Sequence, residues 1–576
     1  MKDRKEFYSL LTEIDGKPYS EYEKLLGGFD FARYVMKCPQ LDVTPDAESP
    51  IFTIRVPQSI AELPGHLYDS PVRRTALEDL LTRNLSEAAR QIARFNESGW
   101  ARRNILVAEP GQKILPRTAV VVTKEYIDAS IRIALPYKVF AEGSEKSRIV
   151  DAEMARKIFF EDLPEVISAS LFCCNIDIAE AEDFVNTMED ADRVRQTLAT
   201  RGLVGFVGEG SLLARERGTD LPDYDNIAPF EVDEDSQSEI EVPNAGSIKG
   251  LGVPVGLTVV LGDVANGRKD FMNALAAGVF NHIPGDGRET SIAVSDAVQI
   301  TVDVERSIQE INLTPFFTEI EGADPSSYST DSADSFTSQA ASAIEALEVG
   351  ARVLIVDENS SSSAFLTTDA RVAGLLGETP RVSLAQRARQ MVDELGISLV
   401  IGGENLVAEY IPIADTILKV EDFQVTNITA EAKALDLSLP PEAPAVNLGP
   451  MLARSRWIMP SSIDAAVGRV DQVIEVLDLK AIQFGRSVIE LDAITQIADE
   501  YQTLTIGLLL YYAKLRYMQE GYPLREMLDM IDRDLSGEGL GSISRDFRGD
   551  LARPRRYELA AALNRLPTFR VSHTTE

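Results

Sequence analysis

The sequence is poor in the residues from which disulfide frameworks and zinc sites are built. Among its 576 residues are only three cysteines and three histidines. Cys173 and Cys174 are neighbours and Cys38 stands alone, which matches neither a disulfide framework nor the spacing of a zinc site. The histidines lie far apart in the sequence, so a histidine-based metal site is not expected. A reducing cytoplasm is the expected location.

Positive charge and long apolar runs are lacking as well. The chain has 57 Lys and Arg against 91 Asp and Glu, a formal net charge of −34. No overall basic field attracts nucleic acid, so any such contact needs a local basic patch. No run of about 18 apolar residues exists, and the N-terminal segment is charged, unlike a signal peptide. We therefore expect a soluble protein without a membrane contact.

Composition shifts divide the chain into three parts. An acidic stretch at 229–247 and a proline-rich stretch at 437–450 favour surface connections between domains. We predict an N-terminal α+β domain over residues 1–228 and an α/β core over 229–436. A mostly helical C-terminal region with a basic end is expected over 437–576.

The middle part alternates apolar strands with helical patterns. Apolar runs at 257–262, 351–358 and 396–403 predict a largely parallel sheet covered by helices. The first run leads into a loop with glycines at positions 262 and 267, the spacing of a loop that binds phosphate through its N–H groups. A Lys that reaches the β- and γ-phosphates and a Ser or Thr that holds Mg²⁺ should follow. Here the following residues are Arg268 and Lys269, so this pattern alone is weak.

The second run delivers two carboxylates to the end of its strand. In a nucleotide site, Asp357 would bind Mg²⁺ and Glu358 would polarise the attacking water. The alternative interpretation is an ordinary solvated turn. Because the pair lies downstream of a glycine loop in an α/β pattern, we favour the nucleotide site.

Several longer motifs resemble one family, the predicted ATPases of the ABC class. They are NHIPGDGRE (281–289), TSQAA (337–341) before EALEVGARVLIVDE, FEDLPE (160–165), and GDLARPRRYELAAALNR (549–565). The resemblance covers nearly the whole chain. It implies an N-terminal domain, an ABC-type P-loop core that binds ATP and Mg²⁺, a helical C-terminal part, and a homodimer that sandwiches nucleotide.

The chain departs from this family at the nucleotide motifs. The family's Gly-Lys-Ser-Thr becomes Gly267-Arg268-Lys269-Asp270, and an Arg for Lys exchange at such a site is not conservative. The signature Ala-Ser-Gly-Ser-Thr falls on residues 333–337, where Asp334 would present a carboxylate to the partner's γ-phosphate. The candidate nucleotide residues are Gly262, Asn266, Gly267, Arg268, Lys269 and Asp270; the candidate signature residues are Asp334, Ser335, Thr337 and Gln339.

Two hypotheses follow from these departures. The first is a pseudo-ATPase, a scaffold or dimer that binds nucleotide or RNA with little or no hydrolysis. The second is a slow ATPase acting on nucleic acid, in which Lys269 replaces the lost phosphate contact, Asp357 retains the metal and Glu358 acts as the catalytic base.

The C-terminal end is locally basic. The family includes a member thought to pass RNA through a basic pore, so the resemblance implies that Arg553, Arg555 and Arg556 contact RNA. The alternative is that these arginines pair with nearby carboxylates such as Asp550 and Glu558.

Overall fold

The computed structural model describes residues 1–44, 48–93, 103–142, 145–225, 228–368, 380–449, 455–517, 522–544 and 548–572. The chain divides into two compact units. The first comprises Met1–Glu189 together with Glu538–Arg553, and the second comprises Asp190–Gly537 together with Pro554–Glu576.

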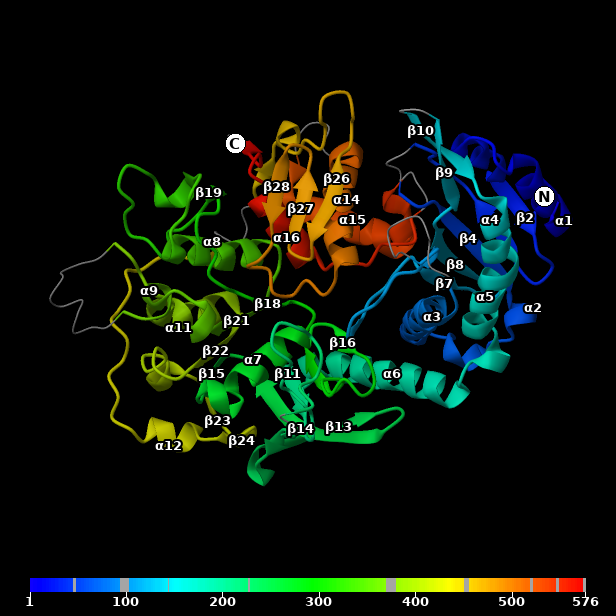
Figure 1. The fold of residues 1–576 in the computed structure, drawn as a ribbon. Helices are drawn as coiled ribbons and strands as arrows, with labels where there is room; N and C mark the ends of the chain where they lie inside the picture. Colours follow the sequence, from blue (N-terminus) through cyan, green and yellow to red (C-terminus); the bar gives the residue numbers. More distant parts are fainter. Residues whose placement is uncertain are drawn as a thin grey trace. The chain divides into compact units, whose positions relative to one another are not determined.

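The first unit is built on a sheet in the order β1-β2-β3-β4-β8-β5, with β7 beside β8 (Figure 1). Helix α3 starts where the Ser70 hydroxyl accepts the Arg73 N–H, with a proline in the first turn. The strands are β1 (Lys2–Asp3), β2 (Gly27–Asp30), β3 (Val35–Cys38), β4 (Ile51–Pro57), β5 (Ile105–Leu106), β6 (Lys113–Ile114), β7 (Val120–Val122), β8 (Tyr126–Ile133), β9 (Tyr137–Glu142) and β10 (Glu145–Val150). The helices are α1 (Arg4–Ile14), α2 (Gln58–Ala61), α3 (Pro71–Ile92), α4 (Ala152–Lys157), α5 (Leu163–Leu171) and α6 (Ile178–Thr200), the last of which continues into the second unit.

A segment from near the C-terminus completes the first unit. The Thr118 N–H donates to the Leu551 carbonyl at 3.1 Å, and the Leu551 N–H donates to the Thr118 hydroxyl at 3.1 Å. Gly549 lies against Ser130 so closely that a Cβ at position 549 would come within 2.0 Å of the Ser130 Cβ. Asp550 pairs with Arg132 and Arg548, whose charges hold the pKa of its carboxyl below the usual value although burial raises it. We call residues 548–553 the strap.

The second unit contains the sheet that the apolar runs predict. Its order is β12-β24-β23-β15-β22-β21-β18, and the five strands from β23 to β18 are mutually parallel. The strands are β12 (Glu231–Val232), β24 (Gln424–Asn427), β23 (Thr416–Glu421), β15 (Leu257–Leu261), β22 (Ser398–Gly403), β21 (Val353–Asp357) and β18 (Ala297–Gln299). The central strands are buried on both faces, as is typical of parallel sheets covered by helices. The predicted α/β class is confirmed.

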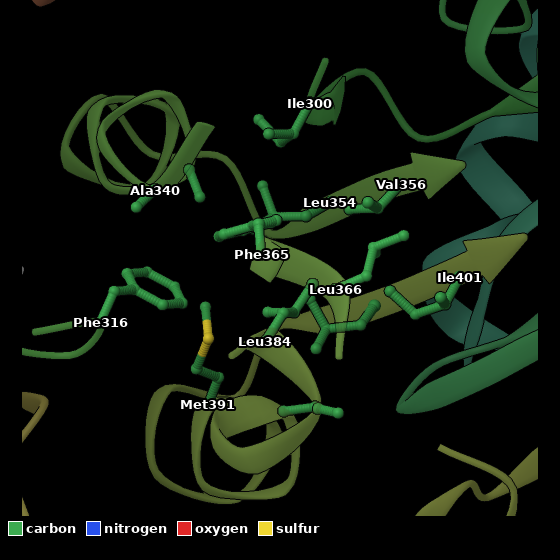
Figure 2. Close-up of a cluster of buried hydrophobic side chains, with 14 of the residues drawn as sticks. Ile300, Phe316, Ala340, Leu354, Val356, Phe365, Leu366, Leu384, Met391 and Ile401 are labelled. Atoms are coloured by element: carbon green, nitrogen blue, oxygen red, sulfur yellow. The ribbon is translucent and has the colours of Figure 1, made fainter. Parts of the chain in front are cut away.

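Helices cover both faces of this sheet. Figure 2 shows the packing on one face, where Leu354 and Ile401 belong to one buried cluster with Ala340 of α8 (Ser335–Glu348) and Met391 of α11 (Leu384–Leu395). On the other face α7 (Arg268–Ala277) packs against β21 and β22. The remaining elements around the core are α9 (Ser363–Leu366), α12 (Thr429–Lys433), β11 (Leu203–Gly208), β13 (Gln237–Val242), β14 (Gly246–Pro254), β16 (Asn281–His282), β17 (Ser291–Ala293), β19 (Ile308–Ile311) and β20 (Tyr328–Thr330).

The C-terminal region combines helices with two small sheets that the sequence does not reveal. One has the order β26-β27-β28 and lies against α14, and the other has the order β29-β25-β30. The elements are β25 (Trp457–Ile458), β26 (Ile474–Asp478), β27 (Ala481–Phe484), β28 (Ser487–Glu490), α14 (Glu500–Arg516), β29 (Tyr522–Pro523), α15 (Leu524–Gly537), α16 (Arg556–Arg565) and β30 (Val571–Ser572). Among the described residues no helix is both long and apolar enough to cross a membrane.

Leu354 lies at the centre of the core and is 1% exposed. We expect Leu354→Ala to lower the free energy of unfolding by about 2–5 kcal/mol, because the cavity adds to the lost transfer free energy. Urea denaturation measures this change. Leu439→Ala is the control, since Leu439 is 69% exposed, and its effect should be small.

Glu78 of α3 accepts the Val122 N–H at 2.8 Å, and burial raises the pKa of its carboxyl to about 7. The folded state therefore holds this proton more tightly than the unfolded state, and stability falls as pH rises from about 4.5 to 7. We expect Glu78→Gln to raise the free energy of unfolding at pH 8 by up to about 3 kcal/mol, with little change at pH 4. The exposed Glu23→Gln should show no such pH dependence; an equal response of the two variants would contradict the assignment.

Candidate nucleotide site

The phosphate-type loop connects β15 to α7, and some of its N–H groups make hydrogen bonds within the loop itself. The Asp263 carboxylate accepts the Ala265 N–H at 3.0 Å, and the Asn266 N–H donates to the Asp263 carbonyl at 3.2 Å. Gly267 has a φ of +93°, and a Cβ there would lie 2.7 Å from the Phe423 ring. Two N–H groups that would face an anion in a phosphate cradle are thus engaged within the loop.

Arg268 is the central residue of the site. It lies at the first position of α7, yet its side chain is fully buried. The guanidinium donates through Nε to the Gly262 carbonyl at 2.8 Å, and its two terminal nitrogens donate to the Asp357 carboxylate and to the Asn359 amide oxygen. The cation is therefore directed inside the loop, where all three of its nitrogens have acceptors.

Asp357 and Glu358 lie where the sequence predicts, at the end of β21, but both carboxylates have partners. Asp357 bonds Arg268 through one oxygen and the Asn359 N–H, at 2.9 Å, through the other. Burial raises the pKa of Asp357, and the positive charge of Arg268 opposes this. One oxygen of Glu358 accepts the N–H groups of Asn405 and Leu406, at 3.0 and 2.9 Å.

Lys269 and Asp270 follow in the first turn of α7. Lys269 is exposed. Asp270 is half-buried, and burial raises its pKa against the lowering effects of Arg288, Lys269 and Arg215. An exposed lysine at a helix N-terminus remains available to an anion, whereas the neighbouring carboxylate opposes one.

These residues do not fit a magnesium site. The predicted metal ligand Asp357 already neutralises a buried guanidinium, and the position that should supply a hydroxyl is Lys269. Across the described ranges, no three His, Cys, Asp or Glu side chains are grouped as metal ligands. Mg²⁺ at Asp357 would require Arg268 to leave its three acceptors.

The signature residues begin α8. Asp334 caps the helix by accepting the Thr337 N–H at 2.8 Å, and its other oxygen pairs with Arg381 at 2.5 Å. Burial raises the pKa of Asp334, but these two partners outweigh burial and the net shift is downward. Ser335 lies 3.4 Å from the Ser362 hydroxyl, between the two Oγ atoms. Arg381 is a member of this group that the sequence analysis missed, because 47 residues separate it from Asp334.

Gln339 is fully buried and bridges α8 to the segment after Glu358. Its amide nitrogen donates to the Ser361 hydroxyl and its amide oxygen accepts the Ser362 N–H, both at 2.8 Å. These contacts make Gln339 a positioning residue for this turn.

The NHIPGDGRE motif forms a buried polar cluster. Asp286 lies 2.6 Å from both His282 Nδ1 and Arg215 Nη2, and Arg288 donates to the Leu213 carbonyl. Burial lowers the pKa of Arg288 to about 10. This motif braces the segment around Leu213 against the 281–289 loop.

The candidate RNA-binding arginines are engaged within the chain. Arg555 pairs with Glu558 and donates to the carbonyls of Ser295 and Ala297. Arg556 pairs with Asp529 and Asp532 of α15. These contacts favour the alternative interpretation, that the basic residues pair with carboxylates. Arg553 belongs to the strap, and its N–H donates to the Pro116 carbonyl at 2.9 Å.

Comparison with known proteins identifies the family of this chain. Residues 177–448 match a family model described as a P-loop domain of ABC ATPases, and residues 4–174 match one described as the N-terminal part of ATPases of the ABC class. The chain belongs to the ATPases of the ABC class. Residues 473–572 match the MRB1590 C-terminal domain.

Two individual proteins are also similar. The uncharacterized protein MJ1628 of Methanocaldococcus jannaschii is 26% identical over 312 residues, which cover 50% of this chain and 65% of that protein. The structure of cbiO1 from Clostridium perfringens, described as part of the ABC transporter complex cbiONQ, matches at 12% identity, covering 34% of this chain and 92% of that chain with a TM-score of 0.21. A score this low carries no argument about this ABC-class ATPase.

The Arg268–Asp357 pair is testable by its effect on stability. We expect Arg268→Met to lower the free energy of unfolding by about 3–5 kcal/mol, because it leaves the Asp357 carboxylate buried without its cation. Adding Asp357→Asn should recover part of this loss, which urea denaturation measures.

Arg389→Met is the matched control, since this more exposed arginine pairs with Asp393 and Asp415 at the surface. Its loss should stay below about 1 kcal/mol. If Arg268→Met is as mild as this control, the buried pair does not hold the loop.

Proposed function

We propose that this ABC-class ATPase is a pseudo-ATPase, a homodimeric cytoplasmic scaffold with little or no hydrolysis. The observation that carries the proposal is the position of Arg268. The residue that should reach the β- and γ-phosphates instead donates to Gly262, Asp357 and Asn359. Its charge is compensated inside the protein, so it adds little attraction for a phosphate chain.

The two carboxylates support the same conclusion. Asp357 is neutralised by Arg268, so a metal ion gains a ligand there only if the guanidinium is left buried without its counter-ion, which is strongly unfavourable. Glu358 has one oxygen committed to the N–H groups of Asn405 and Leu406, which fixes the carboxylate and leaves only its other oxygen to act as a general base on water.

The signature segment supports impaired turnover as well. The Asp334 carboxylate is held ionised by Thr337 and Arg381 at the start of α8. Because the Asp334–Arg381 pair is about half exposed, Arg381 offsets this charge only in part, and the remaining negative charge near a polyanion is unfavourable where water is excluded. A nucleotide-bound dimer of the usual kind would bring such charges together. A scaffold that does not need ATP to dimerise avoids this repulsion.

Slow hydrolysis is the alternative function, and the exposed Lys269 in the first turn of α7 favours it. RNA binding through Arg553, Arg555 and Arg556 has less support, since Arg555 and Arg556 are held in ion pairs. Both stay predictions.

The decisive experiment is calorimetric ATP binding with and without Mg²⁺, together with phosphate release. We expect no Mg²⁺-dependent binding and negligible release from the natural sequence. The triple variant Arg268→Lys, Lys269→Ser, Asp270→Thr should gain Mg²⁺-dependent binding, because it frees Asp357 and restores the metal hydroxyl.

Single Arg268→Lys separates the geometry of the guanidinium from its charge. It keeps the cation, but one nitrogen replaces the three that bond Gly262, Asp357 and Asn359. The proposal is wrong if the natural sequence releases phosphate in Mg²⁺ and Glu358→Gln abolishes that release. Binding that EDTA does not change would favour a nucleotide sensor using Lys269.

A further inference from the structure

Helix α8 begins at the candidate signature residues and is buried along almost its whole length. At its first turns Gln339 bonds Ser361 and Ser362, which follow Asp357 and Glu358 by only a few residues. Helix α8 is thus bonded to the segment that directly follows the candidate metal ligand Asp357 and the candidate catalytic base Glu358.

The last turn of α8 is hydrogen-bonded to the C-terminal region. Glu348 accepts the Arg456 N–H and its Nε, both at 2.9 Å, and both side chains are nearly fully buried. Arg456 directly precedes β25, which pairs with β29 and β30. The Glu348 carbonyl also accepts the Arg525 guanidinium at the start of α15, at 2.6 and 2.8 Å.

Arg456 continues the connection to α16. It donates to the Gln309 carbonyl at 2.9 Å and to the Asn564 amide oxygen at 2.8 Å. One turn earlier on α8, Glu345 pairs with Arg306 through two hydrogen bonds, at 2.9 and 3.1 Å. Buried ion pairs add little stability over apolar packing, but they fix one register because removing either partner is strongly unfavourable.

Helices α8 and α16 are in contact, and a pocket remains between them. The pocket is lined by Ser342 and Ala346 of α8 and by Ala560 and Asn564 of α16. The Asn564 amide nitrogen is buried and has no hydrogen-bond partner in the structure.

We infer that α8 couples the turn after β21 to the C-terminal region. Gln339 is its contact at the nucleotide side, and the Glu348–Arg456 pair is its contact at the C-terminal side. A shift of the C-terminal region then weakens or strengthens the hydrogen bonds of Gln339 to Ser361 and Ser362. This coupling does not depend on whether ATP is hydrolysed, so it holds for a pseudo-ATPase and for a slow ATPase alike.

Hydrogen exchange of the full-length protein tests the coupling. Arg456→Lys keeps the charge but loses the fork that reaches Gln309 and Asn564. We expect the Ser362 amide, which donates to Gln339, to exchange about tenfold faster, an ordinary magnitude for coupled sites. The Val122 amide in the first unit serves as an internal reference and should not change.

Coupling is reciprocal, so Gln339→Leu should accelerate exchange of the Arg456 amide, which donates to Glu348. If Arg456→Lys folds poorly, Glu348→Gln is a second variant at the C-terminal end of α8, because it keeps a side-chain oxygen that can accept from Arg456. Ile417→Val is the matched control, since it trims a fully buried side chain of β23 in the same hydrophobic core.

The inference is overturned if Ile417→Val speeds Ser362 exchange as much as Arg456→Lys does, because the effect is then a general loss of stability. It is also overturned if Arg456→Lys leaves exchange of the Ser362 amide unchanged and Gln339→Leu leaves exchange of the Arg456 amide unchanged. ATP binding measurements on the same variants do not enter this test, so a failed pseudo-ATPase proposal leaves the coupling to be judged by exchange alone.

Discussion

The buried pair between Arg268 and Asp357 is the interaction on which the candidate site depends. A guanidinium without contact to water is tolerated only when its nitrogens have acceptors and its charge has a partner. The Gly262 carbonyl, Asp357 and Asn359 supply these from the loop and from the end of β21. Together they connect two segments that are about ninety residues apart in the sequence.

The substitutions in this site are consistent with one another. Asn359 directly follows the carboxylates of Asp357 and Glu358. Because Arg268 and Asp357 already cancel, a carboxylate at the exposed position 359 would add a negative charge that Arg268 does not neutralise. The neutral amide of Asn359 offers an oxygen to Arg268 without adding that charge. The site is therefore rebuilt around the arginine.

The sequence allowed much of the fold to be predicted but less of the site. The apolar runs at 257–262, 351–358 and 396–403 contain the parallel strands β15, β21 and β22. They could be predicted because strands buried on both faces consist almost entirely of apolar residues. The direction of the Arg268 side chain could not be predicted, since its charged acceptor, Asp357, lies at the end of another strand, β21. The hydrogen bond from the Leu406 N–H to Glu358 could not be predicted for the same reason. The ion pair between Arg555 and Glu558 could be predicted, because the two residues are only three positions apart. The short strands β26–β28 alternate too weakly to be recognised.

The strap has a consequence for biosynthesis. Residues 548–553 complete the first unit, yet they follow α15 of the second unit in the sequence. At a usual synthesis rate of about 5–20 residues per second, the backbone groups around Thr118 wait tens of seconds for Leu551 after the rest of their unit has left the ribosome. During that interval the nascent chain presents an open edge that chaperones or another nascent chain can reach.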